Sequence, residues 1–180
     1  MALVKKLPLA ALCVCGATLL APSAMAQLSR DGGAIEIVAD RGELDDVKRQ
    51  AVYIGNVDVV QGDARLRAKE VVINYNARQG TSGAGGGIGS SVGDIQNIQA
   101  TGDVYYITAR EKVKADRGVY NAKDETINLT GNVRVTNADG VIAGENLKIN
   151  IQTGRYIMDG GTGGRVRTVI DQASKEEPIQ

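Results

Sequence analysis

Ile127-Asn128-Leu129-Thr130-Gly131-Asn132-Val133-Arg134-Val135 alternates apolar and polar residues on either side of a Gly-Asn step. The same design occurs in residues 51–59, around Gly55-Asn56, and in residues 98–106, around Gly102-Asp103. Alternation with a period of two is typical of a β-strand that buries one face. Because the unit recurs, the sequence predicts a fold that is built by stacking such strands.

Small residues recur at two fixed intervals that together make one repeat of the chain. The shorter interval separates positions 55 and 68, and it returns unchanged between 102 and 115 and between 131 and 144. The longer interval separates positions 39 and 55, and it returns between 115 and 131 and between 144 and 160. We expect each repeat to consist of two extended segments joined by a turn, with a small residue where strands bend or approach closely.

One step breaks the period, because Ala68 and Gly102 lie much further apart than the corresponding Ala39 and Gly55. The excess falls on the glycine-rich residues 80–94, whose composition is that of a flexible loop. We therefore expect a flexible insertion at 80–94 within a single all-β domain over residues 27–170. Residues 171–180 are charged and contain Pro178, so we expect a disordered tail.

Residues 1–26 have the features of a secretory signal peptide. Lys5 and Lys6 precede the apolar residues 7–20, and Ala24-Met25-Ala26 is a small-x-small cleavage site, so we expect cleavage after Ala26. A lipoprotein signal is the alternative, since two cysteines lie in the apolar run, but neither follows a small residue. Residues 27–34 are interpreted as a short polar leader, and the first strand is expected to begin at Ile35.

Composition argues against several classes of function. Removal of two lysines with the signal would leave slightly more acidic than basic residues, which gives no general attraction to nucleic acid or anionic membranes. The chain has no histidine, and both cysteines lie in the signal, so the commonest general base and the strongest transition-metal ligands are missing from the exported part. We predict a soluble exported protein that is not an enzyme and that binds neither cofactor nor metal.

The acidic residues that stand out are better interpreted as structural groups. Asp45 and Asp46 are adjacent, and neighbours on a strand point to opposite faces, so they are poorly placed to flank one glycosidic bond. Asp40, Asp116 and Glu145 each follow a small residue of the repeat and are expected to be turn or capping groups.

Separating odd from even positions assigns an apolar face to each strand, and stacking would join these faces into a continuous interior. The chain has no Phe and no Trp, so this interior consists of small aliphatic residues and tyrosine. Such an interior could pack tightly or form a groove for a long apolar molecule, and composition alone favours tight packing. The interior residues considered as candidate ligand contacts are Ile35, Ile37, Tyr53, Val57, Val59, Leu66, Ala68, Val71, Ile73, Val104, Tyr106, Leu129, Val133, Val135, Leu147 and Ile149.

An ordered set of short motifs resembles a known family. The set comprises the opening strand at 35–45, the aromatic-x-Gly-Asn-Val segment at 53–62 with its repeat at 129–133, the segment 143–147, and the closing segment 164–170. In this order the motifs resemble the OstA-like family of lipopolysaccharide export proteins, which includes the periplasmic bridge protein LptA. The resemblance extends over roughly residues 35–170.

The resemblance implies a β-jelly-roll of stacked antiparallel strand pairs with an apolar interior groove. It further implies a periplasmic protein that shields the lipid A acyl chains of lipopolysaccharide in this groove, with the interior residues above as lipid contacts. Open strand edges would pair end to end with LptC-like and LptD-like partners and with further copies of the chain, so that the inner and outer membranes are bridged during outer membrane assembly.

Two related proteins with the same fold fit the sequence less well. LptC keeps an uncleaved membrane anchor, whereas a cleavable signal is expected here, and LptD carries a large C-terminal barrel, which is not expected for this chain. The alternative from a different class is a structural exported β-solenoid with a packed core and no lipid ligand.

Overall fold

The computed structural model describes residues 28, 33–77 and 92–171. None of these residues lies in a helix that is long and apolar enough to cross a membrane. The proposed signal peptide, residues 80–91 of the predicted insertion, and residues 172–180 of the predicted tail lie outside the described residues. The strands are β1 (Glu36–Val38), β2 (Arg41–Asp45), β3 (Gln50–Gln61), β4 (Ala64–Ala77), β5 (Val92–Ile107), β6 (Glu111–Asn121), β7 (Thr126–Asn137), β8 (Gly140–Asn150), β9 (Arg155–Asp159) and β10 (Arg167–Ile170).

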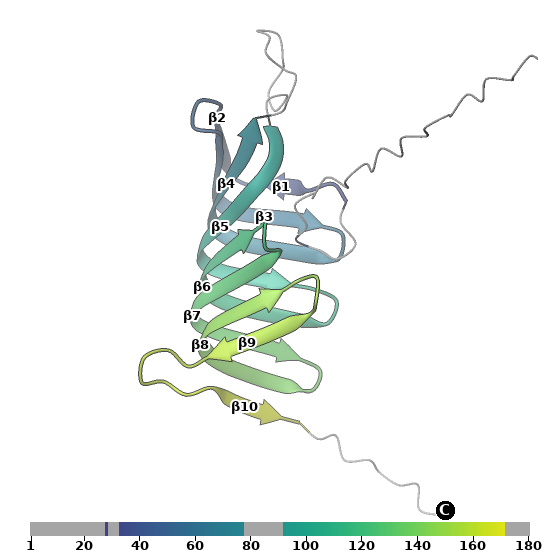
Figure 1. Ribbon diagram of the computed structural model, residues 1–180, viewed down its shortest axis with the longest axis vertical. Helices are drawn as coiled ribbons and strands as arrows, with labels where there is room; N and C mark the ends of the chain where they lie inside the picture. Colours follow the sequence, from purple (N-terminus) through teal and green to yellow (C-terminus); the bar gives the residue numbers. More distant parts are fainter. Residues whose placement is uncertain (1–27, 29–32, 78–91, 172–180) are drawn as a thin grey trace, which may run out of the picture.

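The strands form one antiparallel sheet in the order β1-β3-β4-β5-β6-β7-β8-β10, with β2 also paired to β3 and β9 also paired to β8. Figure 1 shows them stacked along the long axis of the molecule, with near and far halves that form two layers. Consecutive long strands pair with one another, and short turns such as Gly62-Asp63 join them except for β4 and β5, between which residues 78–91 lie in the sequence. The predicted all-β jelly-roll of stacked antiparallel strand pairs is confirmed.

The Gly-Asn steps are β-bulges at which the strands bend. Gly131 and Asn132 have φ angles of 81° and 48°, and together they lie opposite the single residue Glu145, since Thr130 pairs with Asn146 and Val133 with Gly144. Gly55-Asn56 and Gly102-Asp103 have the same pair of positive φ angles and the same break in register. Two residues opposite one bend a strand and increase its twist, so the repeated step folds the sheet into two layers.

Side chains on an adjacent strand, or in the case of Asp40 between β1 and β2, hold each bulge in place. Asn132 Nδ2 donates a hydrogen bond of 2.7 Å to Asp116 Oδ2, and Asn56 Nδ2 donates one of 2.9 Å to Asp40 Oδ2. At the Gly102-Asp103 bulge, Asp103 stands where the other two bulges have asparagine. It forms a 2.7 Å ion pair with Lys69, and the hydrogen bond from Lys69 lowers the pKa of Asp103. Asp40 and Asp116 are therefore structural groups that hold the bulges, in line with the sequence interpretation.

The predicted insertion ends earlier than expected. Val92–Asp94 were assigned to the flexible stretch 80–94, but they belong to β5, and Val92 pairs with Ala77 at the end of β4. That part of the prediction was wrong because the insertion does not simply add a loop: its last residues lengthen the β4–β5 hairpin. The β4–β5 hairpin reaches the upper end of the molecule in Figure 1, as does the turn between β2 and β3.

Candidate functional site

The space between the two layers is the apolar interior, to which all the long strands contribute. Register shows how one row of side chains runs along the stack: Val71 on β4 pairs with Ala100, which pairs with Gly118, then Leu129, then Leu147 on β8. A second row in the other layer runs through Val59, Leu66, Tyr106, Val113 and Val135. The interior is therefore continuous along the long axis of the molecule.

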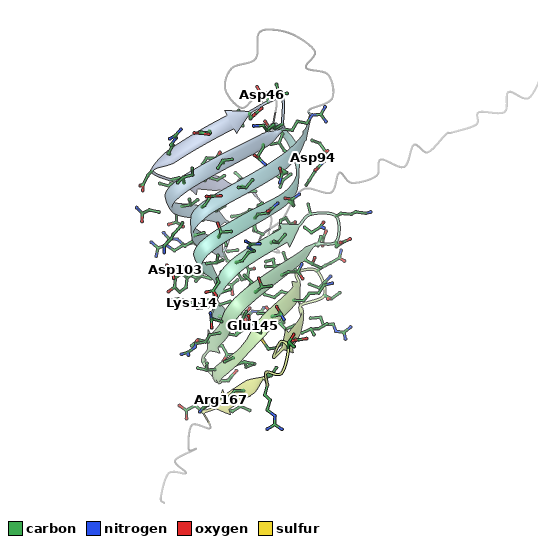
Figure 2. The ribbon with its side chains drawn as sticks, turned by 90° about the vertical axis from the view of Figure 1, so that its left-hand side faces the viewer. Asp46, Asp94, Asp103, Lys114, Glu145 and Arg167 are labelled. Atoms are coloured by element: carbon green, nitrogen blue, oxygen red, sulfur yellow. The ribbon has the colours of Figure 1, made fainter. Side chains whose placement is uncertain are left out.

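The structure places every candidate residue in this interior or against it. Ile35, Ile37 and Tyr53 are partly buried and pack against the core. The buried ones are Val57, Val59, Leu66, Ala68, Val71, Ile73, Val104, Tyr106, Leu129, Val133, Val135, Leu147 and Ile149. Polar positions of the alternation lie outside, and Figure 2 shows Asp103, Lys114, Glu145 and Arg167 on the outer side of the ribbon.

Several interior residues were not found from the sequence. Val113, Ala115 and Tyr120 on β6 are buried, and Val113 and Ala115 alternate with the exposed Lys112 and Lys114 in the strand. This alternation is the signal that could have identified them. Gln61, at the end of β3, is a buried polar residue that is likewise absent from the sequence-derived set.

Leu28 is the largest departure from the sequence interpretation. It was expected in a polar leader, but it is only 3% exposed and belongs to the core cluster. Its backbone N–H donates to Gln61 Oε1 at 2.5 Å, and its carbonyl accepts a hydrogen bond of 3.1 Å from Tyr106 Oη. Gln61 Nε2 also donates to the Gly33 carbonyl at 3.0 Å. Two buried polar side chains therefore hold this residue between the layers.

With Leu28 in place little free space remains in this part of the interior. The space left beside it is about 10 Å³, which is barely enough for one water molecule. A wider hollow of about 290 Å³ opens at the rim, where polar residues such as Asp63, Arg110 and Thr153 meet Tyr106. The structure thus has a packed interior next to a polar opening.

Shifted pKa values belong to buried phenols and surface pairs. Burial raises the pKa of Tyr106, and burial together with the hydrogen bond to Asp46 raises that of Tyr75. On the outer surface, the hydrogen bond from Arg65 lowers the pKa of Asp58. Within the described ranges, no group of three or more His, Cys, Asp or Glu side chains is placed to hold a metal ion. The arrangement offers a packed apolar interior with a polar rim.

Comparison with protein families identifies the family to which this fold belongs. A family model described as LptA/(LptD N-terminal domain) LPS transport protein matches residues 36–155, from the first residue of β1 to the first residue of β9. The chain belongs to this family. It is therefore an LptA-like protein of the OstA type, and its role lies in lipopolysaccharide transport.

Two further similarities, to one protein sequence and to one solved structure, agree with this family assignment. An uncharacterized protein of Rhizobium meliloti (strain 1021) is 32% identical over 172 residues, which cover 89% of this chain and 88% of that protein. The crystal structure of LptH, the LptA homologous periplasmic component of the conserved lipopolysaccharide transport device from Pseudomonas aeruginosa, matches with a TM-score of 0.62. That match covers 77% of this chain and 96% of LptH at 20% identity, so it supports the LptA fold alone.

Proposed function

We propose that this LptA-like chain is a periplasmic lipopolysaccharide-binding protein that shields lipid A acyl chains in its apolar interior and bridges the inner and outer membranes. The observation that carries the proposal is the continuity of the interior, whose apolar rows cross every strand from β3 to β8. Family membership, the likeness to a periplasmic component of a transport device, and the signal-like N-terminal residues support the location.

The energetics of acyl chains explain why a carrier needs such an interior. A methylene group that leaves water gains about 0.8 kcal/mol, so a chain of about a dozen carbons exposes on the order of 10 kcal/mol of unfavourable surface. A continuous apolar interior can offset this cost at each position of the lipid along the molecule. No covalent step is required, and the lipopolysaccharide sugars stay in water.

Both ends of the sheet are suited to pairing with another protein. At each end the last long strand carries two short strands, β1 and β2 on β3, and β9 and β10 on β8. Within the described ranges, the exposed large hydrophobic residues all lie near these ends: Val38, Leu44, Val47, Ile54, Tyr156, Ile157, Val166, Val169 and Ile170. Open edges with apolar side chains favour strand addition, here by LptC-like and LptD-like partners or by further copies in a head-to-tail oligomer.

Site-specific photo-crosslinking tests the location of the lipid. A crosslinker at Ile37 or Val133 should capture lipopolysaccharide, because both residues face the apolar interior. The matched controls are Asn132 and Arg134, which are exposed neighbours of Val133 on the same strand and should give little product. Equal capture at interior and exterior positions, detected by immunoblotting, would contradict an interior site.

Removal of β10 tests end-to-end assembly. A chain that ends before Arg165 lacks β10, so residues 140–143 of β8 lose the strand that pairs with them. Concentration-dependent oligomers and partner binding should then be lost. The control ends after Asp171 and keeps the whole strand. Light scattering over a concentration series is the measurement, and unchanged assembly of the shorter chain would place the contact elsewhere.

The packed interior favours a second candidate, a structural exported β-solenoid without a lipid ligand. Only about 10 Å³ is open beside Leu28. The two candidates differ in their response to lipid, since a ligand that binds only the folded state raises the melting temperature. Lipid that is extracted from the purified protein, or a rise in Tm on addition of lipopolysaccharide, supports the carrier, and the absence of both supports the solenoid.

A further inference from the structure

We propose that Leu28 occupies an acyl-chain subsite of the apolar interior, and that lipid enters this subsite by displacing Leu28. This inference rests on the proposed function and deepens it. The Leu28 subsite is defined by the residues that line a small cavity together with Leu28, and they come from β4 to β7 and so from both layers: Leu66, Ile98, Ala100, Tyr106, Gly118, Val119, Tyr120, Ile127 and Leu129.

The position of Leu28 is that of a bound ligand rather than of a sheet residue. The other buried aliphatic side chains of the cluster come from strands, apart from Ile151, which directly follows β8. Leu28 lies far from any strand end in the sequence, and hydrogen bonds to the side chains of Gln61 and Tyr106 hold its backbone. A residue held in this way can leave through a local opening that keeps the sheet intact.

The chemistry of the Leu28 subsite suits an acyl chain and its linkage. The isobutyl side chain stands in for a short segment of hydrocarbon, and the Leu28 carbonyl stands in for an ester or amide carbonyl. Tyr106 Oη, which now donates to Leu28 at 3.1 Å, would then donate to the lipid carbonyl. Leaving this buried hydroxyl unpaired would be costly, so the ligand that replaces Leu28 is expected to carry an acceptor there.

An entry path is present on the same side. Tyr106 borders both the closed Leu28 subsite and the polar hollow of about 290 Å³ at the rim. A lipid whose head group lies in the hollow could direct a chain past the Tyr106 ring into the space that Leu28 vacates. Because only about 10 Å³ is free beside Leu28, the chain cannot enter while Leu28 remains.

Hydrogen exchange of the whole chain tests displacement directly, with lipopolysaccharide as the probe. In the lipid-free protein the Leu28 amide should be protected by its bond to Gln61. At saturating lipid this amide should lose protection while amides of β4 to β7 keep or gain it. If lipid binds and the Leu28 amide stays protected, the inference is overturned although the carrier function stands. If no amide responds and no binding is seen, the proposed function itself fails, and the inference with it.

A variant supplies the second measurement. Leu28→Ala shortens the side chain that competes with lipid for the Leu28 subsite. The affinity of this variant for lipopolysaccharide should therefore rise by about tenfold, as expected when a larger fraction of molecules is competent to bind. The matched control is Val72→Ala on β4, a half-buried residue outside the Leu28 subsite, and its affinity should not change. Equal affinity of Leu28→Ala and the unaltered chain would overturn the inference even if the variant folds less stably.

Discussion

Replacement of Gly131 by alanine should lower the free energy of unfolding by roughly 2–5 kcal/mol. A non-glycine residue in the left-handed region costs about 1–2 kcal/mol, and forced overpacking adds about 1–3 kcal/mol. Both costs apply here, because Gly131 has a φ of 81° and an added Cβ would lie 2.5 Å from Asp116 Oδ2. The carboxylate could rotate away, but Asp116 Cβ at 2.8 Å could not do so without a backbone shift. Chemical denaturation measures the loss.

Gly163→Ala is the matched control for this prediction. Gly163 has nearly the same φ of 78°, but no heavy atom lies within 4 Å of its added Cβ. It should therefore show the backbone cost alone, about 1–2 kcal/mol. If the two variants lose the same stability, contact with Asp116 contributes nothing and the bulge does not depend on close approach of the strands. A G131A variant in the D116G background, which lacks the Asp116 Cβ, should recover part of the difference.

The Gly131 bulge illustrates which features of the fold can be predicted from sequence. Bulge positions are determined locally, since a Gly-Asn step within an alternating strand supplies two residues that adopt the left-handed conformation in succession. Burial of Leu129, Val133 and Val135 is determined by the same alternation, because a strand of a two-layer fold has only one inner face. The burial was predicted correctly because the repeat supplies the pattern several times over.

The features that were missed depend on contacts that are distant in the sequence. Leu28 is one apolar residue in a polar segment, and nothing nearby indicates that Gln61 and Tyr106 will hold it. The beginning of β5 depends on pairing with the end of β4, across residues whose composition is that of a loop. Composition also could not distinguish a packed interior from an open groove, since the same side chains line both.

Replacement of Val133 by aspartate should destabilise the chain at pH 7 by several kcal/mol and leave little folded protein. Val133 is 1% exposed in the apolar interior, where it pairs with Gly144 on β8 and lies on the same strand face as the buried Leu129 and Val135. None of these residues can pair with a carboxylate. An unpaired buried ion costs several kcal/mol, which is comparable to the about 5–15 kcal/mol by which a typical domain is stable.

The loss should depend on pH in a defined direction. Burial disfavours the charged form, so the new carboxyl should have a pKa in the folded chain above its unfolded value of about 3.9. The carboxyl is neutral in both states below that value, and the penalty is then limited to burial of a polar group. As the pH rises through the unfolded pKa the unfolded state loses its proton first, so stability falls until the folded pKa is passed. Denaturation curves at pH 4 and pH 7 measure this difference.

Arg134→Asp is the control that separates the two faces of the strand. Arg134 is exposed and is the next residue along β7, so the same carboxylate should stay solvated there and should change stability little at either pH. If Val133→Asp were equally well tolerated, the interior would have to admit water or a counter-charge, and an apolar chamber for acyl chains would be untenable. If only the Val133 variant unfolds, the interior excludes charge. A carrier must have this property if acyl chains are to enter it while the phosphorylated sugars remain outside.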